Sequence, residues 1–473
     1  MGQEISETSF SAADFAEFRE RLYRETEHLR EQIANGALES GAAMAGCELE
    51  AWLVDSLGQP APINQRLLDT LDHPDVVPEL STFNIELNTA PQELGAGALE
   101  TLHSQLRKLW QRCEREAGKL DAHLAMIGIL PTVRQSDLRL ANVSSMRRFL
   151  ALNEQIFAMR GGVPIELDIN GAEHLSLTHH DLMLEAAATS FQIHYKVAPD
   201  KAVRAFNASK MLSAPLVAVS ANSPYLFGYD LWDETRIPLF EQAVAVGGSP
   251  YSSRVTFGIR YLRDSIMETF DANRDFYPVL LPELMDTALD EYAHLRLHNG
   301  TIWRWNRPLV GFSADGSPHL RIEQRVAPAG PTLTDMIANT AFYFGALTAM
   351  LDGEGEVELR LPFEIASRNF YAAAQHSLHA HVEWFDGERI RMQELVVQQL
   401  IPLAARGLEQ LGYSAQDAGH WLGIIRERAL SGRTGSRWQR SWIARNGRNF
   451  GELVCRYREH QSSDVPVHEW PQQ

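Results

Sequence analysis

Several short segments of the chain alternate between apolar and polar residues. This pattern predicts β-strands, because successive side chains of a strand point to opposite faces. In residues 46–54, Glu48, Glu50 and Trp52 share one face, while Cys47 and Leu49 share the other. The same alternation occurs in residues 82–90, 190–197 and 319–327. Apolar runs at 125–130 and 216–220 predict two further strands.

Other stretches have the spacing of helices. Apolar residues recur with helical periodicity in residues 10–35, 99–124 and 200–214, and Gly-Pro-Thr at 330–332 precedes a helix that extends to about residue 350. Residues 132–175 read as irregular, and residues 390–459 as mainly helical. We therefore predict an α+β fold, with a catalytic core and its N-terminal helix at 1–350. Residues 351–473 form a mainly helical C-terminal region packed on that core.

The polar faces of the four alternating segments carry unusual groups. Glu48 and Glu50 are neighbours on one face with no Lys or Arg nearby in the sequence, and such charges repel unless a cation lies between them. Glu86, His194 and Glu323 are good metal ligands, and Arg321 and Arg325 suit a phosphate or carboxylate. The alternative is an antiparallel sheet with one solvated face. We favour a sheet whose polar face binds metal ions, because Mg²⁺ usually takes one or two protein carboxylates per ion and binds nucleotide phosphates with its remaining positions.

Composition narrows the class of protein. The 473 residues carry a formal net charge of −18, which disfavours binding to nucleic acid or to an anionic membrane. No stretch approaches the length of a membrane span. Three scattered cysteines indicate reduced thiols and a cytoplasmic protein. The chain also lacks GxSxG, HExxH and Rossmann motifs, which removes the usual support for serine hydrolases, zincins and dehydrogenases.

Five short motifs occur in an order that resembles a known family. They are GCELE at 46–50, FNIELN at 83–88, FQIHY at 191–195, ANSPY at 221–225 and RIEQR at 321–325. Together they resemble the glutamate–cysteine ligase family and its carboxylate–amine ligase relatives over residues 44–350. The resemblance implies the fold of glutamine synthetase, an antiparallel half-barrel sheet flanked by helices, whose concave face holds metal ions and ATP.

The resemblance also implies roles for individual residues. Metal ligands are Glu48, Glu50, Glu79, Glu86, His194 and Glu323. Arg325 meets the transferred phosphate of the nucleotide, with Arg321 beside it as a second catalytic arginine. Substrate-binding residues are Asn84, Gln192, Asn222 and Arg236, the last contacting a substrate carboxylate. The implied reaction uses ATP and Mg²⁺ (or Mn²⁺) to join glutamate to an amine through an acyl phosphate. Cysteine is the favoured amine, which would place the enzyme in glutathione biosynthesis.

Two features keep alternatives open. Gln192 stands where close relatives commonly carry a second histidine, and residues 298–308 resemble an uncharacterised subgroup of the family. The same fold with another amine acceptor is therefore one alternative, and a non-catalytic nucleotide or amino-acid sensor is another. The Trp303–Arg307 cluster is read as core tryptophans beside surface arginines, or as an adenine or substrate platform. The number of metal ions and the oligomeric state stay open.

Overall fold

A computed structural model describes residues 4–246, 253–353 and 357–471. Within these residues the centre of the fold is an eight-stranded antiparallel sheet with the path β11–β12–β8–β1–β3–β2, in which β4 and β5 also pair with β1. Its strands are β1 (Met44–Val54), β2 (Val76–Pro78), β3 (Asn84–Asn88), β4 (Gln92–Glu93), β5 (His123–Ala125), β8 (Phe191–Val197), β11 (Asn306–Phe312) and β12 (Pro318–Gln324). The sheet forms an antiparallel half-barrel flanked by helices, so the predicted α+β fold class is confirmed.

Small hairpins and helices surround this sheet. The hairpins pair β6 (Ile165–Asn170) with β7 (His174–His179), β9 (Tyr225–Leu226) with β10 (Tyr229–Asp230), and β13 (His381–Glu383) with β14 (Arg389–Arg391). The first eight helices are α1 (Ala12–Ala34), α2 (Asn64–Leu71), α3 (Ala98–Gly118), α4 (Arg147–Met159), α5 (Ala202–Ser220), α6 (Arg236–Ala243), α7 (Met267–Phe276) and α8 (Ala293–Asn299) within the described residues. They are followed by α9 (Leu333–Asp352), α10 (Val357–Arg360), α11 (Phe363–His376), α12 (Met392–Leu395), α13 (Ile401–Gln410), α14 (Ala415–Ser431), α15 (Gly435–Asn446) and α16 (Phe450–Ser462).

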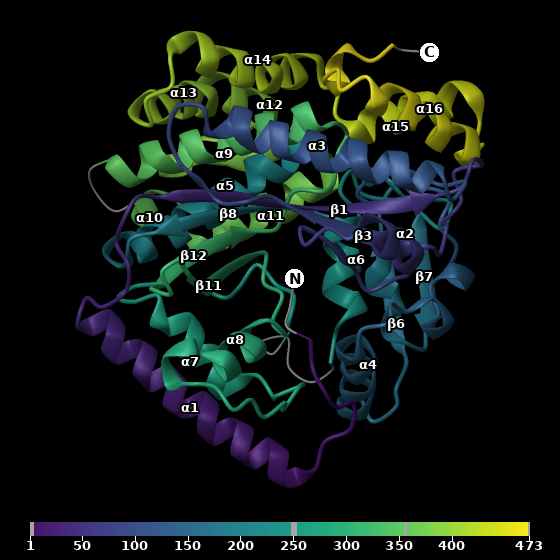
Figure 1. Cartoon of the computed structure of the whole chain (residues 1–473). Helices are drawn as coiled ribbons and strands as arrows, with labels where there is room; N and C mark the ends of the chain where they lie inside the picture. The colour runs from purple at the N-terminus through teal and green to yellow at the C-terminus, as the bar shows by residue number, and fades with distance from the viewer. Residues whose placement is uncertain (1–3, 247–252, 354–356, 472–473) are drawn as a thin grey trace.

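One face of the sheet is covered by two layers of helix. Helices α3, α5 and α9 lie directly above the sheet, and α13 and α14 lie beyond them (Figure 1). Both α5 and α9 are buried on nearly every side, as expected for helices between a sheet and an outer layer. In the described part of the chain, no helix is both long and apolar enough to pass through a lipid bilayer.

The opposite face of the sheet is left open between smaller helices. Helix α8 packs against β11, while α4 and α6 pack against the 3₁₀ segment Leu182–Ala187 (Figure 1). Helix α1, which begins with a capping box between Ser11 and Asp14, packs on α8 from outside. These elements form the walls around the polar face of the sheet.

The structure corrects three predictions about elements. The expected strand at 216–220 is the last part of α5, which continues through Pro215 because it is buried all round and so has no polar face to mark its period. The expected strand at 125–130 is reduced to β5. The stretch 132–175, expected to be irregular, contains α4, β6 and the first two residues of β7. The four alternating segments are found as β1, β3, β8 and β12.

Candidate active site

Strand register brings the predicted acidic residues together on the open face of the sheet. Glu50 on β1 lies opposite Glu86 on β3, and Glu48 lies opposite Gln192 on β8. His194 on β8 lies opposite Glu323 on β12. Directly opposed residues of antiparallel strands have Cβ atoms about 5 Å apart, so side chains from four strands can share one ion or ligand.

Glu48, His194 and Glu323 form the first group of potential metal ligands. The His194 Nε2 atom lies 2.9 Å from Glu48 Oε1 and 3.9 Å from Glu323 Oε1, and one ligand atom from each residue lies within 4.8 Å of the others. Burial opposes ionisation of Glu48, whereas the neighbouring His194 and Arg321 favour its charged form. Burial also opposes ionisation of Glu323, yet nearby arginines hold its pKa at about 2. Both carboxyl groups are therefore charged at neutral pH.

Glu50, Glu79 and Glu86 form the second group, again with ligand atoms within 4.8 Å of one another. Glu50 accepts hydrogen bonds of 2.6 and 2.8 Å from the backbone N–H and the hydroxyl of Ser190, and Glu86 accepts one of 2.8 Å from Asn88. Burial, followed by the charges of Glu86 and Glu50, raises the pKa of Glu79 well above its usual value. Three carboxylates at this spacing repel one another when ionised, so a divalent cation fits between them.

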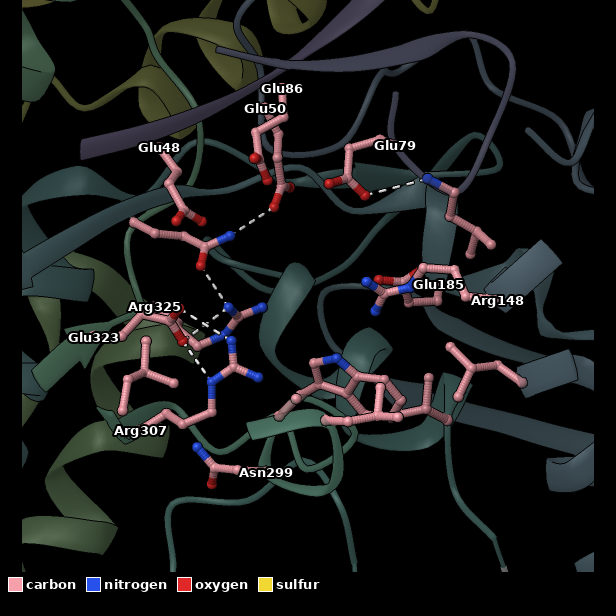
Figure 2. A pocket seen from close by; sticks show the side chains of 18 of the residues that line it. Glu48, Glu50, Glu79, Glu86, Arg148, Glu185, Asn299, Arg307, Glu323 and Arg325 are labelled. Atoms are coloured by element: carbon pink, nitrogen blue, oxygen red, sulfur yellow. Dashed lines mark hydrogen bonds and ion pairs between the residues drawn. The ribbon is translucent and has the colours of Figure 1, made fainter. Parts of the chain in front are cut away.

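Gln192 and Arg325 connect the two groups. Arg325 lies beside Glu323 in Figure 2. The Gln192 amide donates a 2.9 Å hydrogen bond to Glu50 Oε1, and its carbonyl accepts one from Arg325 Nη1. The same Nη1 atom lies 3.0 Å from Glu323 Oε2. Arg325 is buried, and its pKa is raised because Glu323 and Glu50 outweigh the effect of burial. The guanidinium predicted to meet phosphate thus lies between the two potential metal groups.

Two more arginines line this side of the cavity. Arg307 on β11 donates hydrogen bonds of 2.7 and 3.0 Å to the two oxygens of Glu323, in the parallel bidentate geometry that guanidinium groups favour. Arg321 also lines the cavity, where its charge favours the charged form of Glu48. The site therefore interleaves acidic and basic groups, as expected for a surface that binds both cations and phosphates.

The far side of the cavity contains residues that the sequence did not indicate. Arg148 and Glu185 lie across the cavity from Glu323 and Arg307 (Figure 2). Arg148 is 6% exposed, and its Nε and Nη1 atoms have no hydrogen-bond partner among the described residues. Burial raises the pKa of Glu185 to about 8. The wall beside them is apolar, formed by Leu80, Phe149, Leu152, Leu182, Val244 and Trp303.

Three predicted substrate residues lie outside this cavity. Asn84 accepts a hydrogen bond from the Ser81 hydroxyl behind the second acidic group. Asn222 is fully buried and donates 2.8 Å hydrogen bonds to the Ala329 carbonyl and the Tyr457 hydroxyl. Arg236 is buried beneath Arg325 and lines only a small hollow next to the cavity. The structure thus gathers the predicted metal ligands, Gln192, Arg321 and Arg325, but not these three.

A family model called glutamate–cysteine ligase family 2 matches residues 44–460. The chain belongs to this family. The predicted membership is confirmed, and with it the prediction of an ATP-dependent ligase that joins a carboxylate to an amine. No curated protein sequence matches the chain.

Two solved structures show how far the family's architecture extends. A glutamate–cysteine ligase from Francisella tularensis, in complex with AMP, is 12% identical with a TM-score of 0.58, covering 92% of this chain and 91% of that one. A bifunctional glutathione synthetase from Pasteurella multocida is 13% identical with a TM-score of 0.50, covering 93% of this chain and 55% of that one. At these identities the likeness concerns the fold, so residue roles depend on the geometry above.

Proposed function

We propose that this ligase activates the side-chain carboxylate of glutamate with Mg²⁺–ATP and transfers the acyl group to the amine of cysteine. The observation that carries the proposal is the pairing of two potential metal groups, three ligands each, on either side of Arg325. The all-oxygen group of Glu50, Glu79 and Glu86 suits Mg²⁺, and the group that includes His194 also suits Mn²⁺. The product would be a precursor for glutathione biosynthesis, made in the cytoplasm.

The roles of the residues follow from this arrangement. Divalent cations held by the two groups would neutralise ATP phosphate charge and polarise the γ-phosphoryl group. Arg325 and Arg321 stabilise the negative charge that develops when the carboxylate oxygen attacks the γ-phosphorus and ADP leaves. The amine nitrogen then attacks the carbonyl carbon of the acyl phosphate, and phosphate departs with the proton that the amine loses. Gln192 keeps Arg325 and Glu50 in register during both steps.

The buried guanidinium of Arg148 favours a substrate that carries a second carboxylate besides the one that reacts. A buried guanidinium with two N–H groups unpartnered among the described residues is costly unless a ligand anion completes its hydrogen bonds. A donor with a second carboxylate would meet this need, since its reacting carboxylate lies at the metal groups across the cavity. Glutamate has that form.

The apolar wall of the cavity favours a second class of amine acceptor, one with an apolar or aromatic side chain. The wall that contains Phe149, Leu152 and Trp303 is apolar and large compared with the side chain of cysteine. An amine with an apolar or aromatic side chain would bury this surface, with a gain of roughly 25 cal/mol for each Å² of apolar area. Such an acceptor keeps the same chemistry and changes only the amine.

The test is product analysis with a pool of amines. Enzyme, Mg²⁺, ATP and glutamate are incubated with cysteine, with apolar amino acids and amines, and separately with hydroxylamine, which traps acyl phosphates as hydroxamates. We expect glutamyl hydroxamate and ADP in equal amounts, and one amine that accelerates ADP release. The matched control is Arg325→Ala, for which loss of a preorganised donor should slow turnover by about 100-fold or more. Absence of hydroxamate with the wild-type enzyme would reject the proposal.

A further inference from the structure

We infer that Arg236, predicted from the sequence to bind a substrate carboxylate, instead positions Arg325 through a buried network that extends from Asn222 to Trp305. The inference rests on the proposed function, in which Arg325 contacts the transferred phosphoryl group. It assigns a positioning role to two residues predicted to bind substrate and to the tryptophan-rich segment before β11.

The backbone of Arg325 is fixed from both sides. β12 ends at Gln324, so Arg325 and Val326 lie beyond the regular ladder. The Arg325 N–H donates a 3.0 Å hydrogen bond to the Trp305 carbonyl. The Arg236 Nη2 atom donates to the carbonyls of Arg325 and Val326, at 3.2 and 2.6 Å. Buried carbonyls need donors, and here one guanidinium supplies them where strand pairing ends.

Arg236 itself is held rigidly. Its Nε atom lies 3.3 Å from Glu234 Oε1, and both side chains are almost completely buried. Its guanidinium lies over the Trp305 ring, 5.3 Å from the ring centroid. Glu234 Oε2 accepts a 2.8 Å hydrogen bond from the Asn222 N–H. Asn222 in turn donates to Ala329 and Tyr457, which ties the segment after Arg325 to helix α16.

Trp305 completes the network at its other end. Its indole N–H donates a 2.8 Å hydrogen bond to Glu241, which accepts another of 2.8 Å from the Tyr371 hydroxyl. Trp305 is fully buried, and Arg307, two residues later, binds Glu323. The same segment of chain therefore fixes the backbone of Arg325 and the carboxylate that Arg325 contacts. A shift of about 1 Å in such a group is enough to slow catalysis by roughly 100-fold.

The competing role for Arg236 is direct binding of a substrate carboxylate. Arg236 lines a small hollow together with Glu50, Glu185 and Arg325, so a ligand there would lie beside it. The two roles predict different kinetics. Loss of a positioning residue lowers kcat with little change in the KM for glutamate, whereas loss of a substrate-binding residue raises that KM.

The experiment compares Arg236→Gln, Arg325→Ala and the double variant, with Arg254→Gln as the control. Arg254 is an equally buried arginine that donates to the Thr301 and Pro278 carbonyls outside the site. Melting temperature and Mn²⁺ binding verify folding. For Arg236→Gln we expect a kcat about 100-fold lower and a KM for glutamate within about threefold of wild type. Arg254→Gln should lower the melting temperature and leave kcat unchanged.

Calorimetric titration of Mg²⁺–ATP gives a readout that needs no turnover. If Arg236 acts through Arg325, both single variants weaken ATP binding, and the double variant binds no more weakly than Arg325→Ala. Additive losses would overturn the inference, as would a raised KM for glutamate with wild-type kcat. Should Arg236→Gln not fold, Trp305→Phe, which keeps an aromatic ring but loses the bond to Glu241, must lower kcat without raising that KM. If the wild-type enzyme binds ATP but forms no hydroxamate, the proposed function is rejected. The ATP affinities of the single and double variants still test whether Arg236 acts through Arg325.

Discussion

Glu323 on β12 and Arg307 on β11 lie directly opposite each other, and two parallel hydrogen bonds of 2.7 and 3.0 Å join their side chains. Arg325 adds a third bond to the same carboxylate at 3.0 Å. Although burial opposes its ionisation, these cations hold the pKa of Glu323 at about 2. The last predicted metal ligand is therefore charged and oriented before any ion binds.

Arg307 should contribute to catalysis as well as to this geometry. Its Nη1 atom is buried and has no hydrogen-bond partner among the described residues, although the side chain lines the cavity. We expect Arg307→Met to lower kcat by about 100-fold, because one preorganised donor to the phosphoryl group is lost. Arg307→Lys should recover only part of the rate, since an ammonium cannot reproduce the bidentate pairing. Steady-state kinetics with ATP measure this, and wild-type kcat in both variants would contradict it.

The second acidic group should make stability depend on divalent cations. Glu50, Glu79 and Glu86 repel one another when no ion lies between them, so we expect Glu79→Gln to raise the melting temperature in EDTA. The same variant should lose most of the stabilisation that Mn²⁺ gives the wild-type protein. Thermal unfolding with and without Mn²⁺ measures both effects. Glu185→Gln is the matched control, because Glu185 lines the same cavity but belongs to neither group; an equal loss there would argue against a metal site at Glu79.

The sequence could predict the floor of the site because strand alternation fixes which side chains share a face. Glu48 and Glu50, or His194 and Lys196, need only their own strand to be placed together. Registers between strands are set by tertiary structure, so the order β12–β8–β1–β3 could not be predicted from the sequence. Asn222 and Arg236 hydrogen-bond to backbone carbonyls, which a motif cannot indicate, because a motif does not say whether a residue contacts substrate or backbone.

The sequence also carries two signals for hairpins. Asn170-Gly171 stands at the end of the alternating residues 165–170, and Asp315-Gly316 lies between β11 and β12. Both dipeptides are typical of hairpins. The second signal predicts that β11 and β12 pair but not their register, which places Arg307 opposite Glu323. Arg148 had no such signal, since an arginine at the start of a helix is ordinary until its surroundings are known.

Thiol reactivity should separate the three cysteines. Burial raises the pKa of Cys47 and of Cys113 to about 12, and both side chains are inaccessible. Cys455 on α16 is partly exposed. Because the thiolate is the reactive form, iodoacetamide at pH 8 should label Cys455 in the native protein and all three cysteines in denaturant. Mass spectrometry of the peptides measures this, and rapid native labelling of Cys47 would show that the sheet opens.

Lys210 on α5 should make stability rise with pH. Burial lowers the pKa of Lys210 to about 7, and its ammonium group lies 5.0 Å from the ring centroids of both Phe206 and Phe257. Between pH 7 and about 10 the unfolded chain binds a proton at this lysine that the folded chain does not, so the free energy of unfolding increases with pH. We expect Lys210→Met to be more stable than wild type at pH 7, by a few kcal/mol at most, with the difference shrinking toward pH 10. Melting temperatures of both proteins across this range measure it, and a constant difference would contradict the assignment.

The C-terminal region should unfold together with the core. Arg428 on α14 donates hydrogen bonds of 2.6 Å to Asp335 and to Asn339 on α9, and the Arg428–Asp335 ion pair is almost completely buried. Breaking one partner of such a pair costs about 3–5 kcal/mol, because the other charge is left uncompensated. Arg428→Met should therefore lower the melting temperature of the whole chain in a single transition, and Arg428→Met with Asp335→Asn should be less destabilised than Arg428→Met alone. Calorimetry distinguishes this from two separate transitions, which would mean that residues 351–473 form an independent unit. A chain ending at residue 350 is expected to aggregate, since it exposes the face of α9 that α13 and α14 cover.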